Sequence, residues 1–321
     1  MKSLKIKFVD FWPGFNPNDN FITNALKGYE IVITDTPDYL FFSIFGYSHL
    51  KYNCVKIMFV GENIVPDFNL CDYAMGFDFL NFGDRYMRLP LFLICDNFKE
   101  LSVTKDFSPK RMLNRKFCSI VVSNAQVSNP IRERFFRLLS EYKQVDSGGR
   151  LWNNVGGPVA DKQKFISGYK FNIAFENSAV LGYTTEKIMD AMTANTLPIY
   201  WGNPWVGRDF NKRSFVNVNS FASLEKAVEY IVDLDTNDER YLEMMQEPWV
   251  NDVSIFDWED KLCAFLAHIV EKPFAEAQYL VDDGMQKLYK QNMKTLAFVN
   301  EKLKVPRLIS AYKKLSNGKY K

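Results

Sequence analysis

The polar side chains best suited to chemistry in this sequence lie where apolar runs end. The stretch 171–201, FNIAFENSAVLGYTTEKIMDAMTANTLPIYW, begins with an apolar run that stops at ENS (176–178), and YTTEK (183–187) then opens a predicted helix. In open α/β sheets, ligands bind beyond the carboxyl ends of strands and against helix N-termini. The loop between this run and the helix is therefore where we expect a nucleotide to bind.

Lys187 falls in the first turn of the predicted helix if Thr184 is its N-cap. A cation is disfavoured there, because the N-terminus of a helix carries a partial positive charge. A bound diphosphate would explain the lysine, since the ammonium and the free backbone N–H groups would face one anion. Glu186 could accept hydrogen bonds from ribose hydroxyls. Alternatively, Glu186 is an ordinary acid of a first helical turn and Lys187 is a solvated surface lysine.

Two other strand ends carry candidate residues. In SNAQVSNPIRERFFR (123–137), Pro130 starts a predicted helix, and the guanidinium of Arg132 could hold phosphate oxygens. In VGEN (60–63), Glu62 follows an apolar run and could take a proton from an acceptor hydroxyl across a cleft between two domains. The alternatives are a basic residue on the solvent face of a helix for Arg132, and a turn-capping loop residue for Glu62.

Alternation of apolar runs with helical segments predicts two α/β domains, each with a largely parallel sheet, which a chain of 321 residues can accommodate. We place a first domain at 1–113, a second at 114–270, and a helical segment with a basic tail at 271–321. The expected strands and helices are, in chain order, 6–9, 18–26 (helix), 30–33, 39–44, 55–60, 73–77, 117–123, 130–141 (helix), 171–175, 185–194 (helix), 196–201, 215–218, 223–234 (helix), 256–268 (helix) and 276–299 (helix).

The composition argues against several classes of protein. Forty basic and thirty-eight acidic residues leave a net charge of +2, so we expect no nucleic-acid partner. The five cysteines are far apart and lie in apolar stretches, as in a reduced cytosolic protein. Only two histidines occur, and Asp233-Leu234-Asp235 is interpreted as a helix terminus, so we expect no metal site.

We expect a cytoplasmic location, because residues 1–9 suit a strand better than a signal peptide and no apolar run could span a bilayer. From Lys302 onward the chain carries seven basic residues, and an apolar stripe is possible beside them. This tail could lie on an anionic membrane surface at the inner face of the cytoplasmic membrane. A solvated tail is the alternative.

Beyond these segments, the sequence resembles the alpha-1,3/1,4-fucosyltransferase family, especially its bacterial members. The resemblance rests on FENSAVLGYTTEKIMDAM (175–192), LPIYWGNPWVGRDFNKRSFVNVNSF (197–221), and FVGENIVPDFNLCDYAMGFD (59–78) with RYMRLPLF (85–92). It covers roughly residues 5–235 and leaves the last eighty or so unexplained.

The resemblance implies a GT-B fold of two Rossmann-like domains facing a central cleft, with an acceptor-binding first domain and a GDP-fucose-binding second domain. It implies inverting, metal-independent transfer of fucose from GDP-β-L-fucose to an acceptor such as N-acetyllactosamine, forming an α-fucoside of the Lewis-antigen type on lipopolysaccharide or similar glycans. Five residues fall where the family binds the donor, and Glu62 falls where it has its proposed base. The five are Arg132, Asn177, Tyr183, Glu186 and Lys187, with Tyr183 expected to donate a hydrogen bond to phosphate.

Some features do not transfer with the resemblance. The first domain is variable in this family, so acceptor choice and α1,3 against α1,4 linkage stay open. Some bacterial relatives carry heptad repeats before a basic tail, and no clear heptad repeat occurs here. A GT-B enzyme with another nucleotide sugar, or a glycan-binding protein without turnover, remains an alternative.

Overall fold

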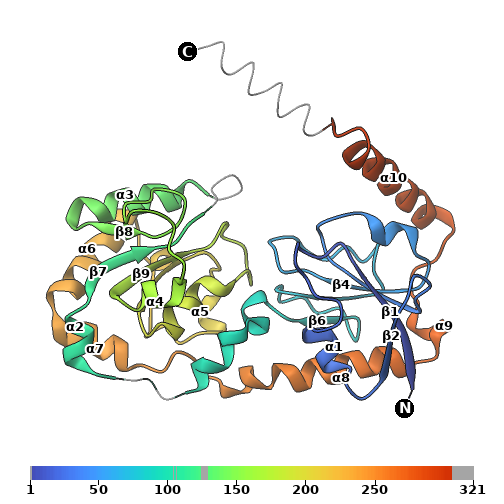
Figure 1. The fold of residues 1–321 in the computed structure, drawn as a ribbon, viewed down its shortest axis with the longest axis horizontal. Helices are drawn as coiled ribbons and strands as arrows, with labels where there is room; N and C mark the ends of the chain where they lie inside the picture. The colour runs from blue at the N-terminus through green and yellow to red at the C-terminus, as the bar shows by residue number, and fades with distance from the viewer. Residues whose placement is uncertain (1, 104, 106, 124–128, 306–321) are drawn as a thin grey trace, which may run out of the picture.

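Two parallel β-sheets, one in each half of the chain, form the framework of the molecule (Figure 1). The structure is a computed structural model that describes residues 2–103, 105, 107–123 and 129–305. The strand order is β2-β1-β3-β4-β5-β6 in the first sheet and β11-β10-β9-β7-β8 in the second, and every pairing between described strands is parallel. The predicted pair of α/β domains is confirmed.

The strands occupy the apolar runs of the sequence, and helices or loops connect them. The strands are β1 Ser3–Val9, β2 Glu30–Ile33, β3 Tyr39–Phe42, β4 Val55–Phe59, β5 Tyr73–Gly76, β6 Tyr86–Arg88, β7 Lys116–Ile120, β8 Val145–Ser147, β9 Tyr169–Phe175, β10 Leu197–Trp201 and β11 Val216–Asn217. The α-helices are α1 Phe21–Ala25, α2 Pro109–Leu113, α3 Ile131–Tyr142, α4 Lys162–Ile166, α5 Glu186–Thr193, α6 Leu224–Thr236, α7 Asp238–Gln246, α8 Trp258–Glu271, α9 Phe274–Ala277 and α10 Gly284–Glu301.

The central strands are buried on both faces, which is why they appear in the sequence as continuous apolar runs rather than as alternating patterns. Every residue of β3, β4, β9 and β10 is buried. Two short strands, β6 and β8, were not predicted. Each has only three residues, which is too few for a periodic pattern.

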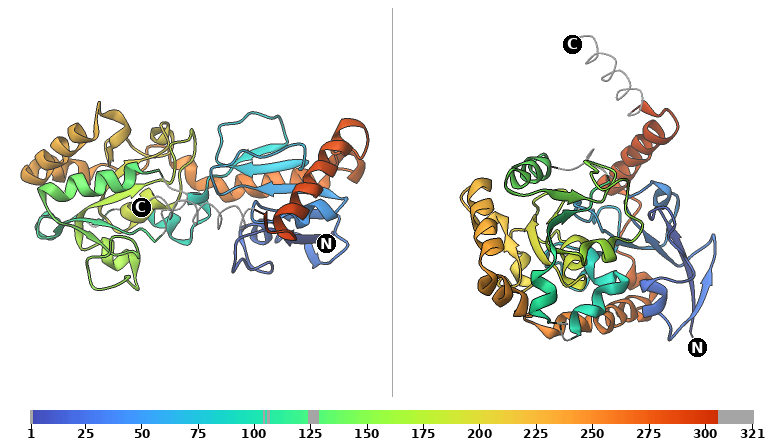
Figure 2. Two further views of the ribbon diagram at one scale, coloured as in Figure 1. Left: turned by 90° about the horizontal axis from the view of Figure 1, so that it is seen from above. Right: turned by 60° about the vertical axis from the view of Figure 1, so that its left-hand side comes forward.

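The chain crosses between the domains more than once. Helix α2 packs against α7, whereas α8 runs back and packs against α1 beneath the first sheet (Figures 1 and 2). Helix α10 also lies on the first domain, against the short 3-10 helix at Ser48–Lys51. The domain bounds 1–113, 114–270 and 271–321 stay a prediction, and α8 of the second predicted domain packs against α1 of the first.

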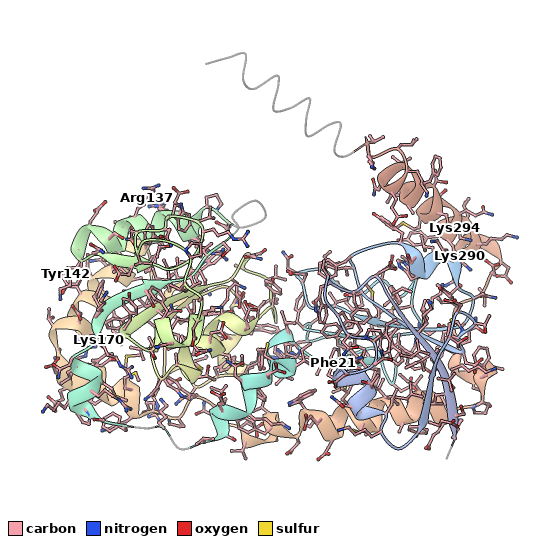
Figure 3. The ribbon with its side chains drawn as sticks, in the orientation of Figure 1. Phe21, Arg137, Tyr142, Lys170, Lys290 and Lys294 are labelled. Atoms are coloured by element: carbon pink, nitrogen blue, oxygen red, sulfur yellow. The ribbon has the colours of Figure 1, made fainter. Side chains whose placement is uncertain are left out.

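The aspartates of the D-x-D sequence lie in the last turn of α6, as interpreted from the sequence. The buried side chain of Asp235 pairs with Lys170 at 3.0 Å and accepts a hydrogen bond from the Tyr142 hydroxyl at 3.0 Å. Tyr142 and Lys170 both lie in the second domain (Figure 3). This aspartate is therefore part of a buried ion pair.

The sequence analysis expected reduced cysteines and no membrane-spanning segment. All five cysteines are free thiols. Among the described residues, none of the helices combines the length and apolar character needed to cross a bilayer. The proposed membrane-binding tail falls mainly on residues 306–321, which lie outside the described residues.

Candidate active site

The loop from β9 to α5 is built around a buried carboxylate. Glu176 directly follows β9 and has no exposed surface. Its Oε1 accepts a hydrogen bond from the backbone N–H of Thr185 at 2.7 Å, and its Oε2 accepts one from the Thr185 hydroxyl at 2.7 Å. Thr185, rather than the predicted Thr184, is the N-cap of α5, and Glu176 holds it through its backbone N–H and its hydroxyl.

Lys187 lies in the first turn of α5, as predicted, and is surrounded by acceptors. Its Nζ donates to the Thr185 hydroxyl at 2.8 Å and lies 3.3 Å from oxygens of both Glu176 and Glu186. Burial alone would lower the pKa of Lys187, but the two carboxylates outweigh it and raise the pKa above its ordinary value. The lysine is thus held as a cation at a helix N-terminus.

Arg132 reaches the same edge of the second sheet from α3. It is 3% exposed, and its Nη2 donates to the backbone oxygen of Phe175 at 2.9 Å and to Oδ1 of Asn177 at 2.8 Å. The backbone N–H of Asn129 donates to the Asn177 oxygen at 2.9 Å, which ties the start of α3 to the loop. Nε of Arg132 is buried and has no hydrogen-bond partner among the described residues.

Glu62 approaches from the first domain, just after β4. Its Oε2 accepts a hydrogen bond from the hydroxyl of Tyr183 at 3.0 Å, and the neighbouring Asn63 donates to the Ser178 hydroxyl at 2.6 Å. The Tyr183 ring packs edge-on against Phe77 of the first domain. The two domains therefore meet across the predicted site.

A cavity of about 450 Å³ brings most of the predicted site residues together. Glu62, Arg132, Asn177, Glu186 and Lys187 all line it. Tyr183 does not line this cavity. Its hydroxyl donates to Glu62, and the hydrogen bond to phosphate that the resemblance implies stays a prediction. Part of the segment 123–137 cannot be compared, because residues 124–128 lie outside the described residues.

The electrostatics of the cavity follow from its burial. Burial lowers the pKa of Arg132, although the nearby carboxylates oppose that effect. Burial would raise the pKa of Glu186, but Lys187 and Lys162 lower it overall. Burial raises the pKa of Tyr183, and the charges of Glu176 and Glu62 add to the increase. Tyr183 therefore stays protonated and acts as a hydrogen-bond donor to Glu62.

Sequence reasoning missed two residues of this region. Glu176 was noted only as the end of an apolar run, and Asn203 was not considered. Asn203 accepts from the backbone N–H of Gly182 at 2.8 Å and donates to the Thr184 hydroxyl at 3.0 Å. Glu176 directly follows β9 and Asn203 lies two residues after the neighbouring parallel strand β10, so their positions at two adjacent strand ends were the signal that could have marked both as candidate site residues.

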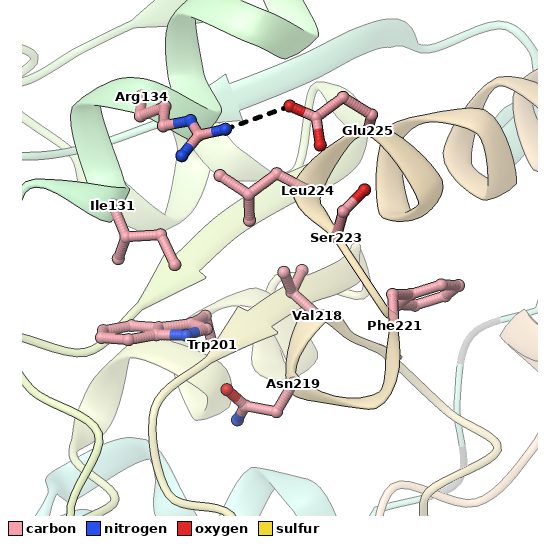
Figure 4. A pocket seen from close by; sticks show the side chains of 9 residues that line it. All are labelled: Ile131, Arg134, Trp201, Val218, Asn219, Phe221, Ser223, Leu224 and Glu225. Carbon is pink, nitrogen blue, oxygen red and sulfur yellow. Dashed lines mark hydrogen bonds and ion pairs between the residues drawn. The ribbon is translucent and has the colours of Figure 1, made fainter.

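A second, smaller cavity of about 310 Å³ lies between the start of α3 and the start of α6 (Figure 4). Arg134 and Glu225 form an ion pair at 3.1 Å across its rim, and Trp201 forms one wall. None of the predicted site residues lines it. Within the described part of the chain, no group of three or more His, Cys, Asp or Glu side chains is arranged to hold a metal ion.

Comparisons with known proteins agree with this architecture. Residues 6–95 match the alpha-(1,3)-fucosyltransferase FucT N-terminal domain, and residues 112–283 match the C-terminal domain of glycosyltransferase family 10 (fucosyltransferase). A crystal structure of an alpha1,3-fucosyltransferase with GDP-fucose superimposes with a TM-score of 0.73 at 33% sequence identity. The match covers 85% of this chain and 92% of the other.

Two curated relatives extend the comparison. The alpha-(1,3)-fucosyltransferase FucT of Helicobacter pylori is 34% identical over 318 residues, covering 84% of this chain and 66% of that protein. Alpha-(1,3)-fucosyltransferase B of Drosophila melanogaster is 27% identical over 190 residues, covering 53% of this chain and 43% of that protein. The chain thus spans less than two thirds of the length of these relatives.

Two α/β domains, each with a parallel sheet, and a polar cavity where the domains meet define the fold of a GT-B glycosyltransferase. Within that class, the match over residues 112–283 and the close structural likeness define the relationship further. The chain belongs to glycosyltransferase family 10, the fucosyltransferases.

Proposed function

We propose that this chain transfers L-fucose from GDP-β-L-fucose to a hydroxyl of an acceptor glycan, with inversion, to give an α-fucoside. The observation that carries the proposal is the cavity in which Arg132 and Lys187 of the second domain lie together with Glu62 of the first. Two cations at helix N-terminal regions suit a diphosphate, and a carboxylate from the other domain suits a base. The relative crystallised with GDP-fucose supports the choice of donor.

In the proposed mechanism, Glu62 takes the proton of the acceptor hydroxyl as its oxygen attacks C1 of fucose. GDP leaves from the opposite face of the sugar, and negative charge grows on its diphosphate. Lys187 and Arg132 stabilise that charge, and Glu186 and Asn177 hold the nucleoside end of the donor. The hydrogen bond from Tyr183 orients the Glu62 carboxylate across the domain interface.

We propose that the reaction needs no bound metal, because two protein cations face the leaving group. We further propose O3 of N-acetylglucosamine in N-acetyllactosamine-type glycans as the acceptor, giving Lewis-antigen-like products such as Lewis x on lipopolysaccharide.

We also propose that the protein is cytoplasmic and that its basic tail binds an anionic membrane surface. Loss of sedimentation with anionic vesicles after removal of residues 302–321 would support the tail's role, and unchanged sedimentation would end it.

The donor is tested by calorimetric titration with GDP, UDP and CDP. We expect GDP to bind with a Kd in the micromolar range, equivalent to about 8 kcal/mol, and the two pyrimidine nucleotides to bind far more weakly. Preferential binding of UDP would overturn the donor and favour a GT-B enzyme that uses another sugar nucleotide. GDP binding without transfer to any glycan would favour a glycan-binding protein.

A further inference from the structure

Glu176 is fully buried directly beneath the residues proposed to bind the diphosphate. Its backbone N–H donates to the Trp201 oxygen at 2.8 Å, which fixes it at the end of β9 beside β10. Gly202 leaves the space that the side chain fills, because a Cβ at position 202 would lie 2.5 Å from Cγ of Glu176. The carboxylate is thus enclosed and cannot reach a ligand in the cavity.

Both carboxylate oxygens of Glu176 are used within the protein. Oε1 and Oε2 accept the N–H and the hydroxyl of Thr185, which fixes the N-cap of α5. Oε2 also lies 3.3 Å from Nζ of Lys187. One buried side chain therefore sets both the start of the helix and the place of the cation in its first turn.

The carboxylates of Glu176 and Glu186 together determine where the Lys187 ammonium lies. Lys187 has two carboxylates beside it, Glu176 with no exposed surface and Glu186 with a side chain 34% exposed. If Glu176 lost its charge, Glu186 would be the one ionic partner left to Lys187 among the described residues, and the lysine would be drawn toward it. That shift would move the Lys187 ammonium along the cavity. It would also pair the ammonium with the Glu186 carboxylate, which is proposed to bind the ribose hydroxyls.

We propose that Glu176 is a positioning residue for donor binding, which acts by holding Lys187 and the first turn of α5 against the diphosphate. The proposal rests on the proposed function. It makes an unusual prediction, because loss of a negative charge near an anion site would by simple Coulomb attraction strengthen anion binding. If Glu176 acts by positioning Lys187, its replacement must instead weaken GDP binding.

The test is calorimetric titration of the full chain with GDP. We expect Glu176→Gln to raise the Kd for GDP about 10- to 100-fold, the range seen when residues that orient metal ligands are replaced. Asp235→Asn is the matched control, because it also neutralises a buried carboxylate paired with a lysine of the second domain. The control is expected to lose stability but to keep its affinity for GDP.

A double-mutant cycle with Lys187→Met separates positioning from general destabilisation. If Glu176 acts through Lys187, adding Glu176→Gln to Lys187→Met changes GDP affinity little further. Additive losses, or unchanged or tighter GDP binding by Glu176→Gln alone, would overturn the proposal. Where affinities are too weak for calorimetry, kcat/KM for GDP-fucose gives the same cycle.

Glu176→Asp covers the case in which the glutamine variant does not fold. It keeps the charge but shortens the side chain by one methylene, so we expect partial retention of GDP affinity and the same non-additivity with Lys187→Met. Additive effects of the aspartate variant would also overturn the proposal. Failure of the wild-type chain to bind GDP would instead refute the proposed function, so the two failures are distinguishable.

Discussion

At the scale of single residues, some side chains of the site line the cavity and others are buried behind them and hold them in place. Glu62, Arg132 and Lys187 line the cavity, whereas Tyr183 and Glu176 are buried behind them. The hydrogen bond between Tyr183 and Glu62 joins the proposed base to the loop from β9 to α5. The proposed base and the proposed donor site are therefore linked by a direct contact between the two domains.

Replacement of the proposed base should separate binding from transfer. Glu62→Gln keeps an oxygen that can accept from Tyr183, so we expect GDP affinity close to wild type. We expect the transfer rate to fall by about 10²- to 10⁴-fold, the usual contribution of general base catalysis. Calorimetry and a transfer assay measure the two effects. Transfer at the wild-type rate would remove Glu62 from the role of base.

Asp78, which follows β5, gives the protein a predictable pH dependence. Its Oδ2 is buried and has no hydrogen-bond partner among the described residues, and burial raises its pKa from 3.8 to about 6. Between pH 3.8 and about 6, the Asp78 carboxyl of the folded protein therefore keeps a proton that the unfolded chain loses. The stabilisation that this proton provides is complete below pH 3.8 and is lost as the pH rises through about 6.

Asp78→Asn should therefore be more stable than wild type at pH 8, by up to about 3 kcal/mol, and nearly equal to it at low pH. Urea unfolding at several pH values measures the difference. A gap that is the same at pH 4 and pH 8 would show that the titration of this carboxyl is not its cause.

Residue types and positions selected Glu62, Arg132, Glu186 and Lys187, and the family resemblance added Asn177; all five line one cavity. Residue types and positions could not give the partner of Tyr183, because Glu62 is distant in the chain and the contact exists only when the domains meet. Nor could they reveal Glu176 as an anchor. Its burial depends on Gly202, which lies after the next strand of the sheet.

At the scale of elements, the loop from β9 to α5 contacts residues that follow strands of both domains. Gly182 has φ of +83°, and a Cβ there would lie 2.6 Å from the backbone oxygen of Phe77 in the first domain. Asn203, after β10, accepts the Gly182 N–H. The sequence predicted β9, α5 and β10 within a few residues because their apolar patterns are long. The contacts that shape the loop are between residues far apart in sequence and were not predictable.

Gly182→Ala tests this close approach. We expect it to lower the free energy of unfolding by about 1–3 kcal/mol, from the positive φ and the clash with Phe77, and to weaken GDP binding. Gly28→Ala is the control, because a Cβ at position 28 meets no atom within 4 Å. If the two variants behave alike in urea unfolding and GDP titration, the loop does not depend on this contact.

At the scale of the whole molecule, a charged pair joins the domains beside the site. Arg88, at the end of β6, donates from Nη1 and Nη2 to the two carboxylate oxygens of Asp209, each at 2.8 Å. The guanidinium also lies 4.0 Å from the centroid of the Phe79 ring. Neither β6 nor this pair was predicted from the sequence, because a bidentate contact between domains has no local pattern.

Asp209→Asn should loosen the domain interface. The Asp209 side chain is 5% exposed, so we expect the loss of this pair to lower the free energy of unfolding by roughly 2 kcal/mol and to slow transfer, since Glu62 and Lys187 come from different domains. Glu229→Gln breaks an exposed pair with Lys226 and should cost less than about 1 kcal/mol. Equal effects of both variants on transfer would argue against a role for the interface.

The central claim, transfer of fucose without a metal, is tested most directly by one assay. The purified chain is incubated with GDP-fucose, EDTA and a panel of lactose, N-acetyllactosamine and lacto-N-biose, and products are examined by mass spectrometry. We predict addition of one deoxyhexose to an acceptor, with an α linkage by NMR. Transfer from a UDP-sugar under the same conditions, with no deoxyhexose added from GDP-fucose, would contradict the account.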